Sequence, residues 1–327
     1  MSDHGARNEG ERLVVIANPR GGGGRAGADR PGVEAAVARA FAKGRVVWTE
    51  SAGHATQLAR SFAESGEVDI VAALGGDGTC HEVVNGLFKD GVIVNRGVVF
   101  SVVPFGTGGD LVRSLQIRKN LKDALWTVST GMTLPLDVIK LTFPASADGV
   151  ARTEMCVNVA GFGINAMVCR MVNGSSKRFG GTATFLGAIF NALGTFVPQP
   201  VDWSWNGPSG PGQATVETLA AFVANGQYCG AGLFVGKGGS MADGLLDVSV
   251  VPKLPLLTAV RHLPKLYAGN FAKVPGVIRV TANHVEIRRS IPIETDGEPA
   301  GDTPVTLDLL PKALMVRGGW LTPPGGG

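Results

Sequence analysis

The first third of the chain alternates short apolar runs with segments whose apolar residues recur every three or four positions. The apolar runs predict buried β-strands, and the segments between them predict amphipathic α-helices. The expected strands cover residues 13–17, 45–49, 70–74 and 98–103, and the expected helices cover residues 30–41, 55–64 and 79–88. This alternation predicts an α/β domain with an open parallel sheet that carries helices on both faces.

The regular alternation of strands and helices ends after residue 136. Runs with strand character recur there, and fewer helices separate them. These runs cover residues 137–143, 154–159, 215–224, 246–251, 284–288 and 305–309. They predict a β-rich second domain of the sandwich or barrel type. A last strand is expected at 312–317, so the predicted domains are 1–136, joined by the segment 312–327, and 137–311.

A glycine turn follows the third expected strand and reads Gly75-Gly76-Asp77-Gly78-Thr79. Strand, tight glycine turn and helix is the arrangement in which backbone N–H groups approach a phosphate closely. The glycines remove the Cβ atoms that would hold a ligand away, and they permit positive φ. The aspartate repels phosphate unless a metal ion or a hydrogen-bond donor lies between them. The turn therefore predicts a nucleotide site with a divalent ion.

Two further glycine turns follow neighbouring strands. The first begins with Asn18 and continues through four glycines, but it lacks the Gly-Lys-Ser/Thr ending of a P-loop. A plain flexible turn is an equally good interpretation of this loop by itself. The other, at residues 104–110, contains Gly106, Thr107 and Asp110. Because the turns all follow strands of one sheet, they predict a single ligand cleft at its carboxyl end.

Two carboxylate turns stand out in the C-terminal half. Within residues 238–247, Asp243 and nearby carbonyl groups offer the oxygen ligands that hard cations prefer. The spacing alone favours a β-hairpin closed by Asp-Gly over a cation site. Further on, Asp296 and Glu298 flank a glycine. Such paired carboxylates can supply a general base, and a solvated turn is the equal alternative.

Net charge, cysteine pattern and one uncharged segment bear on the partners and the location of the protein. The 327 residues carry a formal net charge of +3 and no basic stripe with interleaved aromatic residues, which argues against nucleic acid as a partner. The four cysteines form no CxxC pair and indicate a reduced, cytoplasmic protein. Residues 180–201 carry no charge, but their glycine, threonine and proline content favours a helix with an apolar face over a membrane-spanning helix.

Together these motifs resemble the diacylglycerol kinase catalytic family, which includes bacterial lipid kinases and the sphingosine and ceramide kinases. The matching pieces follow the family's order over most of the chain: Asn18-Pro19, Thr49 with Gly53-His54-Ala55, Gly75 to Thr79 with Glu82, Gly106-Thr107 with Asp110, Asp137, Asp243 to Asp247, and Asp296-Gly297-Glu298. The Gly-Gly-Asp-Gly-Thr piece is shared with the NAD kinase superfamily. The two C-terminal pieces point to the lipid kinase branch.

The resemblance implies an N-terminal α/β nucleotide-binding domain and a C-terminal β-sandwich domain, with ATP and Mg²⁺ as cofactors. The residues that it assigns to the ATP site are Asn18, Thr49, Gly75, Gly76, Asp77, Gly78, Thr79, Cys80, His81, Gly106, Thr107, Asp110 and Asp137. Within this set, the family's acidic network around Mg²⁺ and water corresponds to Asp77, Asp110 and Asp137.

The same resemblance assigns two sites in the C-terminal half. A structural Mg²⁺ is implied at Ser240, Asp243 and Leu245, where the serine and the leucine offer backbone oxygens. Glu298 matches the residue that acts as proton acceptor in the family, and Asp296 is its neighbour.

Two positions depart from the family's pattern. Gly109 stands where the family usually has an asparagine, and His81 stands where an asparagine is frequent. The missing amide at residue 109 removes a donor and an acceptor that could brace the loop, and water can replace it. His81 is expected to be a loop or helix-cap residue, with a phosphate contact as the less favoured alternative.

The predicted function is an ATP-dependent lipid kinase that transfers the γ-phosphoryl group to a hydroxyl of diacylglycerol or a related lipid. Two alternatives remain, an NAD kinase-like kinase of a soluble metabolite and a non-catalytic regulator that binds nucleotide or lipid. A lipid substrate would be presented at a membrane surface, so we expect a cytoplasmic protein with a peripheral position at the inner face of the membrane. Residues 180–196 are the candidate docking segment, with core packing as the alternative. A homodimer stays open.

Overall fold

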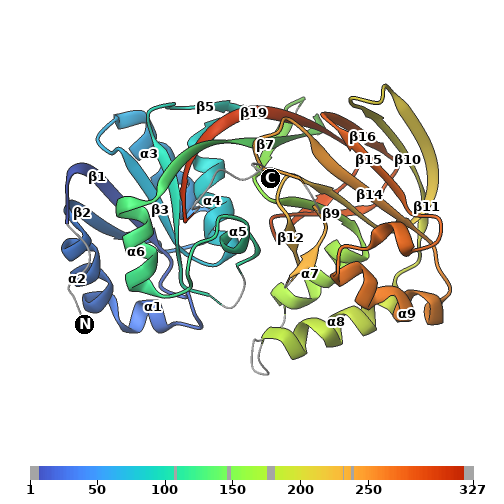
Figure 1. Cartoon of the computed structure of the whole chain (residues 1–327), viewed down its shortest axis with the longest axis horizontal. Helices are drawn as coiled ribbons and strands as arrows, with labels where there is room; N and C mark the ends of the chain where they lie inside the picture. Colours follow the sequence, from blue (N-terminus) through green and yellow to red (C-terminus); the bar gives the residue numbers. More distant parts are fainter. Residues whose placement is uncertain are drawn as a thin grey trace. The chain divides into compact units, whose positions relative to one another are not determined.

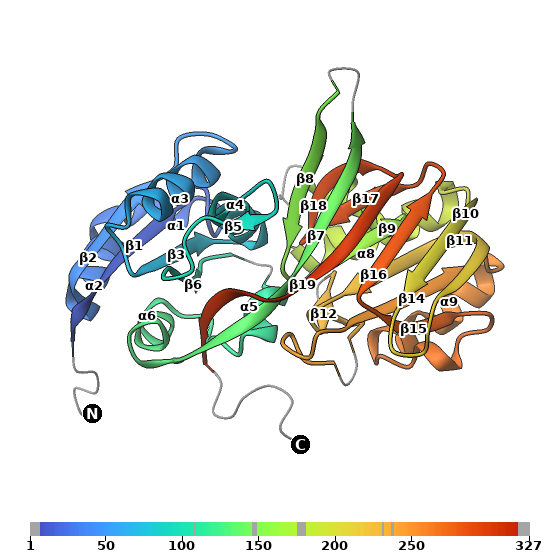
Figure 2. The same ribbon diagram turned by 90° about the horizontal axis from the view of Figure 1, so that it is seen from above.

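The computed structural model describes residues 7–106, 109–145, 149–174, 181–230, 232–236 and 239–319. The chain divides into two compact units, which Figures 1 and 2 show from two sides. The first comprises Met1–Leu136 with Lys312–Gly327, and the second comprises Asp137–Pro311. In the part of the chain that is described, no helix is both long enough and apolar enough to cross a membrane.

The first unit is built on a parallel sheet with the strand order β2-β1-β3-β6-β19. The strands are β1 (Asn8–Ala17), β2 (Phe41–Trp48), β3 (Ile70–Gly75), β6 (Val99–Pro104) and the end of β19 (Val305–Gly318). All residues of the central β3 are buried, as expected for a parallel strand that is covered on both faces. The chain places β2 and β3 on opposite sides of β1. The carboxyl ends of β1 and β3 therefore flank the switch point at which such sheets bind ligands.

Helices cover both faces of this sheet, which confirms the predicted α/β class. They are α1 (Arg25–Ala28), α2 (Arg30–Ala40), α3 (His54–Ser65), α4 (Asp77–Leu87), α5 (Asp110–Ser114) and α6 (Leu121–Thr130), and a small hairpin of β4 (Phe88–Lys89) and β5 (Val92–Ile93) follows α4. α3 packs against α4, and α2 packs against α6. Figure 2 shows these two pairs on opposite sides of the sheet.

Several elements of the first unit begin earlier than the sequence pattern predicts, among them β1, which starts at Asn8 instead of residue 13. α4 starts at Asp77 instead of Thr79, because the extended Gly76 serves as its N-cap and the glycine turn itself becomes the first helical turn. β2 starts at Phe41 instead of residue 45, because the fully buried Phe41 ends α2 in an extended conformation and enters the sheet at once.

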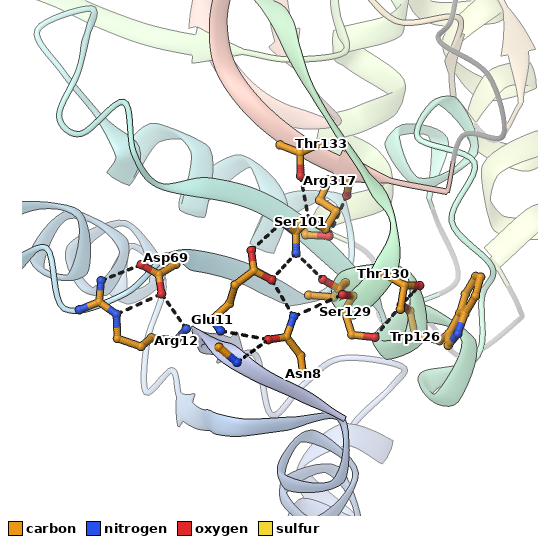
Figure 3. A network of polar contacts seen from close by, with 12 residues as sticks. Asn8, Glu11, Arg12, Asp69, Ser101, Trp126, Ser129, Thr130, Thr133 and Arg317 are labelled. Atoms are coloured by element: carbon orange, nitrogen blue, oxygen red, sulfur yellow. Dashed lines mark hydrogen bonds and ion pairs between the residues drawn. The ribbon is translucent and has the colours of Figure 1, made fainter. Parts of the chain in front are cut away.

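A network of polar contacts ties the end of β19 to β1 (Figure 3). The Arg317 guanidinium donates to both carboxylate oxygens of Glu11, at 2.7 and 2.8 Å. It also donates to Thr133 Oγ1 (2.8 Å) and to the carbonyl oxygen of Val128 (3.0 Å). The Arg317 side chain is only 12% exposed. Its hydrogen bonds to Glu11 lower the pKa of that carboxyl group below the usual range.

The second unit is a β-rich sandwich, as the sequence predicts. Its strands are β8 (Ala151–Cys156), β9 (Val159–Gly163), β10 (Gln199–Asn206), β11 (Gly212–Ala224), β12 (Tyr228–Cys229), β13 (Leu233–Phe234), β14 (Leu246–Pro252), β15 (Ile278–Ala282), β16 (His284–Arg288), β17 (Pro292–Thr295) and β18 (Glu298–Asp302), together with parts of β7 (Met132–Ala145) and β19. Phe162 and Trp203 meet edge to face in its core, with ring centroids 5.4 Å apart.

A second apolar cluster joins the sandwich to α7 (Ile164–Gly174), α8 (Gly181–Thr195) and the short η1 (Phe271–Lys273). The remaining helix, α9 (Leu256–Tyr267), contacts β13 and η1. Phe222 of β11 and Phe271 of η1 pack edge to face at 5.7 Å. Ala192 of α8 is fully buried in the same cluster. Figures 1 and 2 show α8 and α9 on the same side of the strands of this unit.

β7 and β19 each run without interruption from one unit into the other. Residues 305–309 and 312–317, which the pattern predicts as separate strands, are therefore one strand. Proline at residue 311 is a residue that usually marks the end of a strand. The following Lys312 adopts a positive φ of 51°, which is irregular for a strand. The pairing nevertheless continues on both sides, to β16 before this point and to β6 after it.

Candidate active site

The glycine turns of the first unit extend neighbouring strands of its sheet. The Asn18 N–H donates to the carbonyl oxygen of Leu74, and the Phe105 N–H donates to that of Gly75, both at 2.9 Å. These bonds continue the strand pairing past the last residues of β1 and β6. The loops after β1, β3 and β6 are thereby held next to one another, as predicted.

The turn after β3 is packed on one side and open on the other. A Cβ added at Gly75 would lie 2.4 Å from Thr79 Oγ1, so this position has no room for a side chain. A Cβ added at Gly106 would lie 3.2 Å from the Gly76 Cα atom, which shows how closely the two glycine turns approach. At Gly76 an added Cβ would meet nothing within 4 Å. The Gly76 Cα atom therefore borders open space at the start of α4, where an anion can approach the first backbone N–H groups of a helix.

Asn18 connects the first glycine loop to this turn. Its Nδ2 donates to Thr79 Oγ1 at 3.2 Å, and its Oδ1 accepts the N–H of Arg20 at 2.9 Å. The side chain thus braces the loop through both ends of its amide. Thr79 is 6% exposed, so its hydroxyl faces the protein, and the turn offers its backbone to a ligand.

A hydrogen bond joins the glycine turn after β3 to the one after β6. Asp77 Oδ2 accepts the N–H of Gly109 at 3.0 Å, and the neighbouring Asp110 lies 3.6 Å from Arg113. Gly109 itself has φ 120°, and an added Cβ would lie 3.2 Å from Lys119 Nζ. This φ is strained for any residue with a side chain, so the backbone here favours the glycine that stands at residue 109. Thr107, the other predicted ligand of this turn, lies outside the described residues.

Glu82 belongs to a matching motif, but its sequence position does not indicate a role, which its contacts in the structure do. From α4, its carboxylate oxygens accept the N–H groups of Gly53 (3.0 Å) and Ala55 (3.1 Å) at the start of α3. It thus caps a helix whose N-terminus has no capping side chain of its own. The loop that it holds begins at Thr49, which is 8% exposed and donates its N–H to Ala17.

The remaining predicted residues of this unit lie on α4. Cys80 is 2% exposed, so its side chain belongs to the core and only its backbone can meet a ligand. His81 lies within α4, and the expectation of a loop or cap position is wrong because the helix starts four residues before it. Asn85 Nδ2 donates to the carbonyl oxygen of His81 at 2.9 Å.

In the second unit, Asp296 and Gly297 form the tight turn between β17 and β18. Both have positive φ, 52° and 87°, as a two-residue type I′ hairpin requires. The Asp296 carboxylate accepts three backbone N–H groups, from Val157 (3.0 Å), Asn158 (2.8 Å) and Val159 (3.2 Å). The Cys156 thiol donates to it as well, at 3.1 Å. Asp296 therefore anchors the hairpin, which leaves Glu298 as the better candidate base.

Two further residues support this hairpin, and no sequence signal identifies them. Glu294 is 6% exposed and accepts the Gly297 N–H at 2.8 Å. A Cβ at Gly161 would lie 2.1 Å from Glu294 Oε1, so the carboxylate rests directly on a glycine of β9. The Cys169 thiol donates to the Gly297 carbonyl oxygen at 2.9 Å. Burial and the charges of Glu294 and Glu298 raise the pKa of Cys169 above its usual range, so it remains a thiol.

The Asp243 turn differs from the predicted hairpin. β14, which follows it, pairs with β11 and β15 and not with the preceding strand. Asp243 closes the turn by itself, because its two carboxylate oxygens accept the N–H groups of Ser240 and Leu245, both at 3.0 Å. Asp137 is fully buried beside it and accepts the Gly244 N–H at 2.7 Å. Asp137, expected in the acidic network of Asp77, thus has a partner in this turn that the sequence did not indicate.

The turn gathers negative charge that a cation would offset. Burial and the charge of Asp243 raise the pKa of Asp247, while Arg279, at 3.6 Å, partly opposes this change. Among the described residues, no three His, Cys, Asp or Glu side chains form a metal-binding group. The donors here are one carboxylate and backbone carbonyl oxygens. That set fits Mg²⁺, which commonly binds one or two carboxylates and keeps several waters.

Comparison with known families agrees with both units. Residues 12–141 match the diacylglycerol kinase catalytic domain. Residues 158–318 match the YegS C-terminal NAD kinase beta sandwich-like domain. The first range includes the three glycine turns, and the second includes the Asp243 and Asp296 turns.

Individual proteins show the same similarity. A diacylglycerol kinase of Bacillus subtilis is 28% identical over 259 residues, which cover 78% of this chain and 79% of that protein. A protein of Alcanivorax borkumensis, named as a YegS-like lipid kinase, is 26% identical over 279 residues, with 83% and 85% covered. A crystal structure from Bacillus anthracis, named as a diacylglycerol kinase, shares the fold with a TM-score of 0.72 at 23% identity and covers 94% of this chain and 97% of that chain.

Proposed function

Because the chain belongs to the diacylglycerol kinase catalytic family, we propose that it transfers the γ-phosphoryl group of ATP to a hydroxyl of diacylglycerol or a related lipid. The observation that carries the proposal is the open backbone at Gly76, where the start of α4 meets the glycine turns after β1 and β6. Phosphoryl transfer depends mainly on positioning and on electrostatic stabilisation of oxygen charge. The N–H groups of this turn supply both to a triphosphate.

The β17–β18 hairpin of the second unit supplies the general base that takes the proton of the lipid hydroxyl. Glu298 accepts the proton of the lipid hydroxyl as that oxygen attacks the γ-phosphorus atom and the bond to the β-phosphate oxygen breaks. Asp296, Glu294 and Cys169 hold the hairpin on which Glu298 lies. Mg²⁺, when bound, offsets negative charge on the phosphate oxygens. Asp77 and Asp110 are the residues of the first unit that would hold it, directly or through water.

An assay with γ-labelled ATP and Mg²⁺ tests the activity. The full chain is incubated with diacylglycerol, a sphingoid base, ceramide or NAD, and products are identified by mass spectrometry. We expect a phosphomonoester of one of the lipids and no phosphorylated NAD. A labelled NAD product would instead assign the chain to soluble-metabolite kinases, and ATP binding without any product would overturn the proposal.

Mg²⁺ is expected to stabilise the second unit through the turn that contains Ser240, Asp243 and Leu245. At a Mg²⁺ concentration about 100 times the Kd, linkage raises the free energy of unfolding by about 2.7 kcal/mol, or about 5 °C in Tm. Thermal melts with and without Mg²⁺, in the absence of ATP, measure this shift. Asp243→Asn should remove the shift, whereas Asp302→Asn, at an exposed position of β18, should retain it. Equal shifts in both variants would place the ion elsewhere.

A further inference from the structure

Exposed apolar side chains gather on α9. Leu256 is 56% exposed, Leu257 is 81% exposed and Val260 is 36% exposed. Single exposed apolar residues are common on protein surfaces and need no explanation. Three within five residues of one helix form a contiguous patch, which in a water-soluble unit marks a contact surface.

The spacing of these residues places them on the outer side of the helix. Leu257, Val260, Arg261 and Pro264 stand at positions i, i+3, i+4 and i+7, so they share one face, and all four are exposed. Ala259, on another face, is 9% exposed. A surface helix of a globular protein ordinarily turns charged residues outward. α9 instead turns leucine, valine and proline outward, with arginine among them.

The chain segment that contains α9 carries ionised side chains of one sign only. Residues 248–285 contain no aspartate or glutamate, whereas they contain Lys253, Arg261, Lys265, Lys273 and Arg279. Two of these are neutralised, since Lys253 lies 3.5 Å from Glu217 and Arg279 lies 3.6 Å from Asp247. Within the described part of the chain, Arg261, Lys265 and Lys273 form no ion pair. The pKa of His262 is lowered by burial and by the positive charges of Lys265 and Arg261, which are not offset locally.

α8 lies on the same side of the second unit (Figures 1 and 2) and also turns an apolar side chain outward. Phe190 in α8 is 55% exposed, and Val197 just beyond it is 68% exposed. No aspartate or glutamate occurs between residues 155 and 201. Outward apolar residues next to uncompensated positive charge are the pattern of helices that lie in the interface of an anionic bilayer.

We propose that α9, together with Phe190 of α8, docks the second unit on an anionic membrane surface. Leu256, Leu257 and Val260 enter the boundary between headgroups and acyl chains, and Arg261, Lys265 and Lys273 meet lipid phosphates. The proposal rests on the proposed lipid kinase function in that the acceptor lipid resides in such a membrane. The positive charges of Arg261, Lys265 and Lys273 favour an anionic lipid surface over a second copy of the chain, which would set these like charges against each other.

Co-sedimentation with vesicles tests the docking. The probes are vesicles of phosphatidylcholine with an equal part of phosphatidylglycerol, and vesicles of phosphatidylcholine alone. We expect stronger binding to the anionic vesicles, a loss of at least about tenfold in Leu257→Asp, and about fivefold for each charge removed by Arg261→Gln or Lys265→Gln. Val92→Asp in the β4–β5 hairpin is the matched control, since Val92 is 66% exposed, and it should bind like the wild type.

Turnover on a short-chain diacylglycerol dispersed in water separates docking from catalysis. Leu257→Asp should keep this activity, because the substrate reaches the protein without a membrane. A chain that phosphorylates no lipid but still loses vesicle binding in Leu257→Asp would refute the kinase and retain the docking surface. Wild-type vesicle binding by Leu257→Asp would overturn the docking. So would a dimer that Leu257→Asp dissociates while vesicle binding is unchanged, since the patch would then join two copies.

Discussion

Glu298→Gln is expected to lower lipid phosphorylation by about 10²–10⁴-fold, the usual contribution of a general base. The amide cannot accept the hydroxyl proton, but it keeps the size of the side chain at the start of β18. Tm should therefore stay close to that of the wild type. Steady-state kinetics with ATP and the best lipid of the panel measure the loss, and it should fall on kcat because the proton moves only in the chemical step.

Asp296→Asn is the informative comparison, because its effect is expected on stability. The Asp296 carboxylate accepts the N–H groups of Val157, Asn158 and Val159. In the asparagine variant, an NH₂ group replaces one of the accepting oxygens and faces some of these donors. Leaving such donors unsatisfied should cost about 3 kcal/mol of unfolding free energy. If a well-folded Asp296→Asn loses turnover and Glu298→Gln retains it, the roles assigned to these carboxylates are reversed.

Arg317→Met is expected to reduce the free energy of unfolding of the first unit by about 3 kcal/mol. The methionine fills part of the arginine's volume but removes the paired donors to Glu11 and those to Val128 and Thr133. The Arg317 side chain is 12% exposed and that of Glu11 is 34% exposed, so the pair is partly buried, and removing the arginine leaves the Glu11 charge without its partner. Urea unfolding followed by tryptophan fluorescence and circular dichroism measures the difference.

The control lies in the same part of the molecule (Figure 3). Arg12 also forms a paired contact with a carboxylate, that of Asp69. Its side chain, however, is 46% exposed and that of Asp69 is 39% exposed. Arg12→Met should therefore change the unfolding free energy by only about 0–1 kcal/mol. Equal effects of the two substitutions would show that burial does not determine the strength of these pairs.

The Glu11 pair also predicts a dependence on pH. The pKa of Glu11 is lowered in the folded state by Arg317, so the pair stabilises the fold fully above the unfolded pKa of 4.5. That contribution is lost as the pH falls through the lower folded pKa. Arg317→Met should therefore lose less stability than the wild type on acidification over this range.

The sequence predicts the elements of the first unit well for a physical reason. Strands buried on both faces must be apolar throughout, so β3 stands out as a continuous run between polar segments. The parallel order then places every turn that follows a strand at one edge. The position of the strands along the chain therefore suffices to group the three glycine turns. The start of α4 was missed because Gly76, a poor helix former by propensity, serves as its cap.

The support of the Asp296 hairpin could not be predicted, because its partners carry no side-chain signature. The groups that hold Asp296 are mainly backbone N–H groups after β8, and every residue except proline has one. The same holds for Asp137, whose partner is the N–H of Gly244. Motif matching located these carboxylates, but only the fold separates an anchor such as Asp296 from a candidate base such as Glu298.

The passage of β19 from the second unit into the first has a consequence for synthesis on the ribosome. The four N-terminal strands of the parallel sheet are complete when residue 104 has been made, but the strand that covers β6 arrives more than 200 residues later. Until then β6 is an exposed sheet edge, and Glu11 lacks its ion-pair partner Arg317. The nascent first unit must therefore remain unfinished, and open to pairing with other chains, through the translation of the whole second unit.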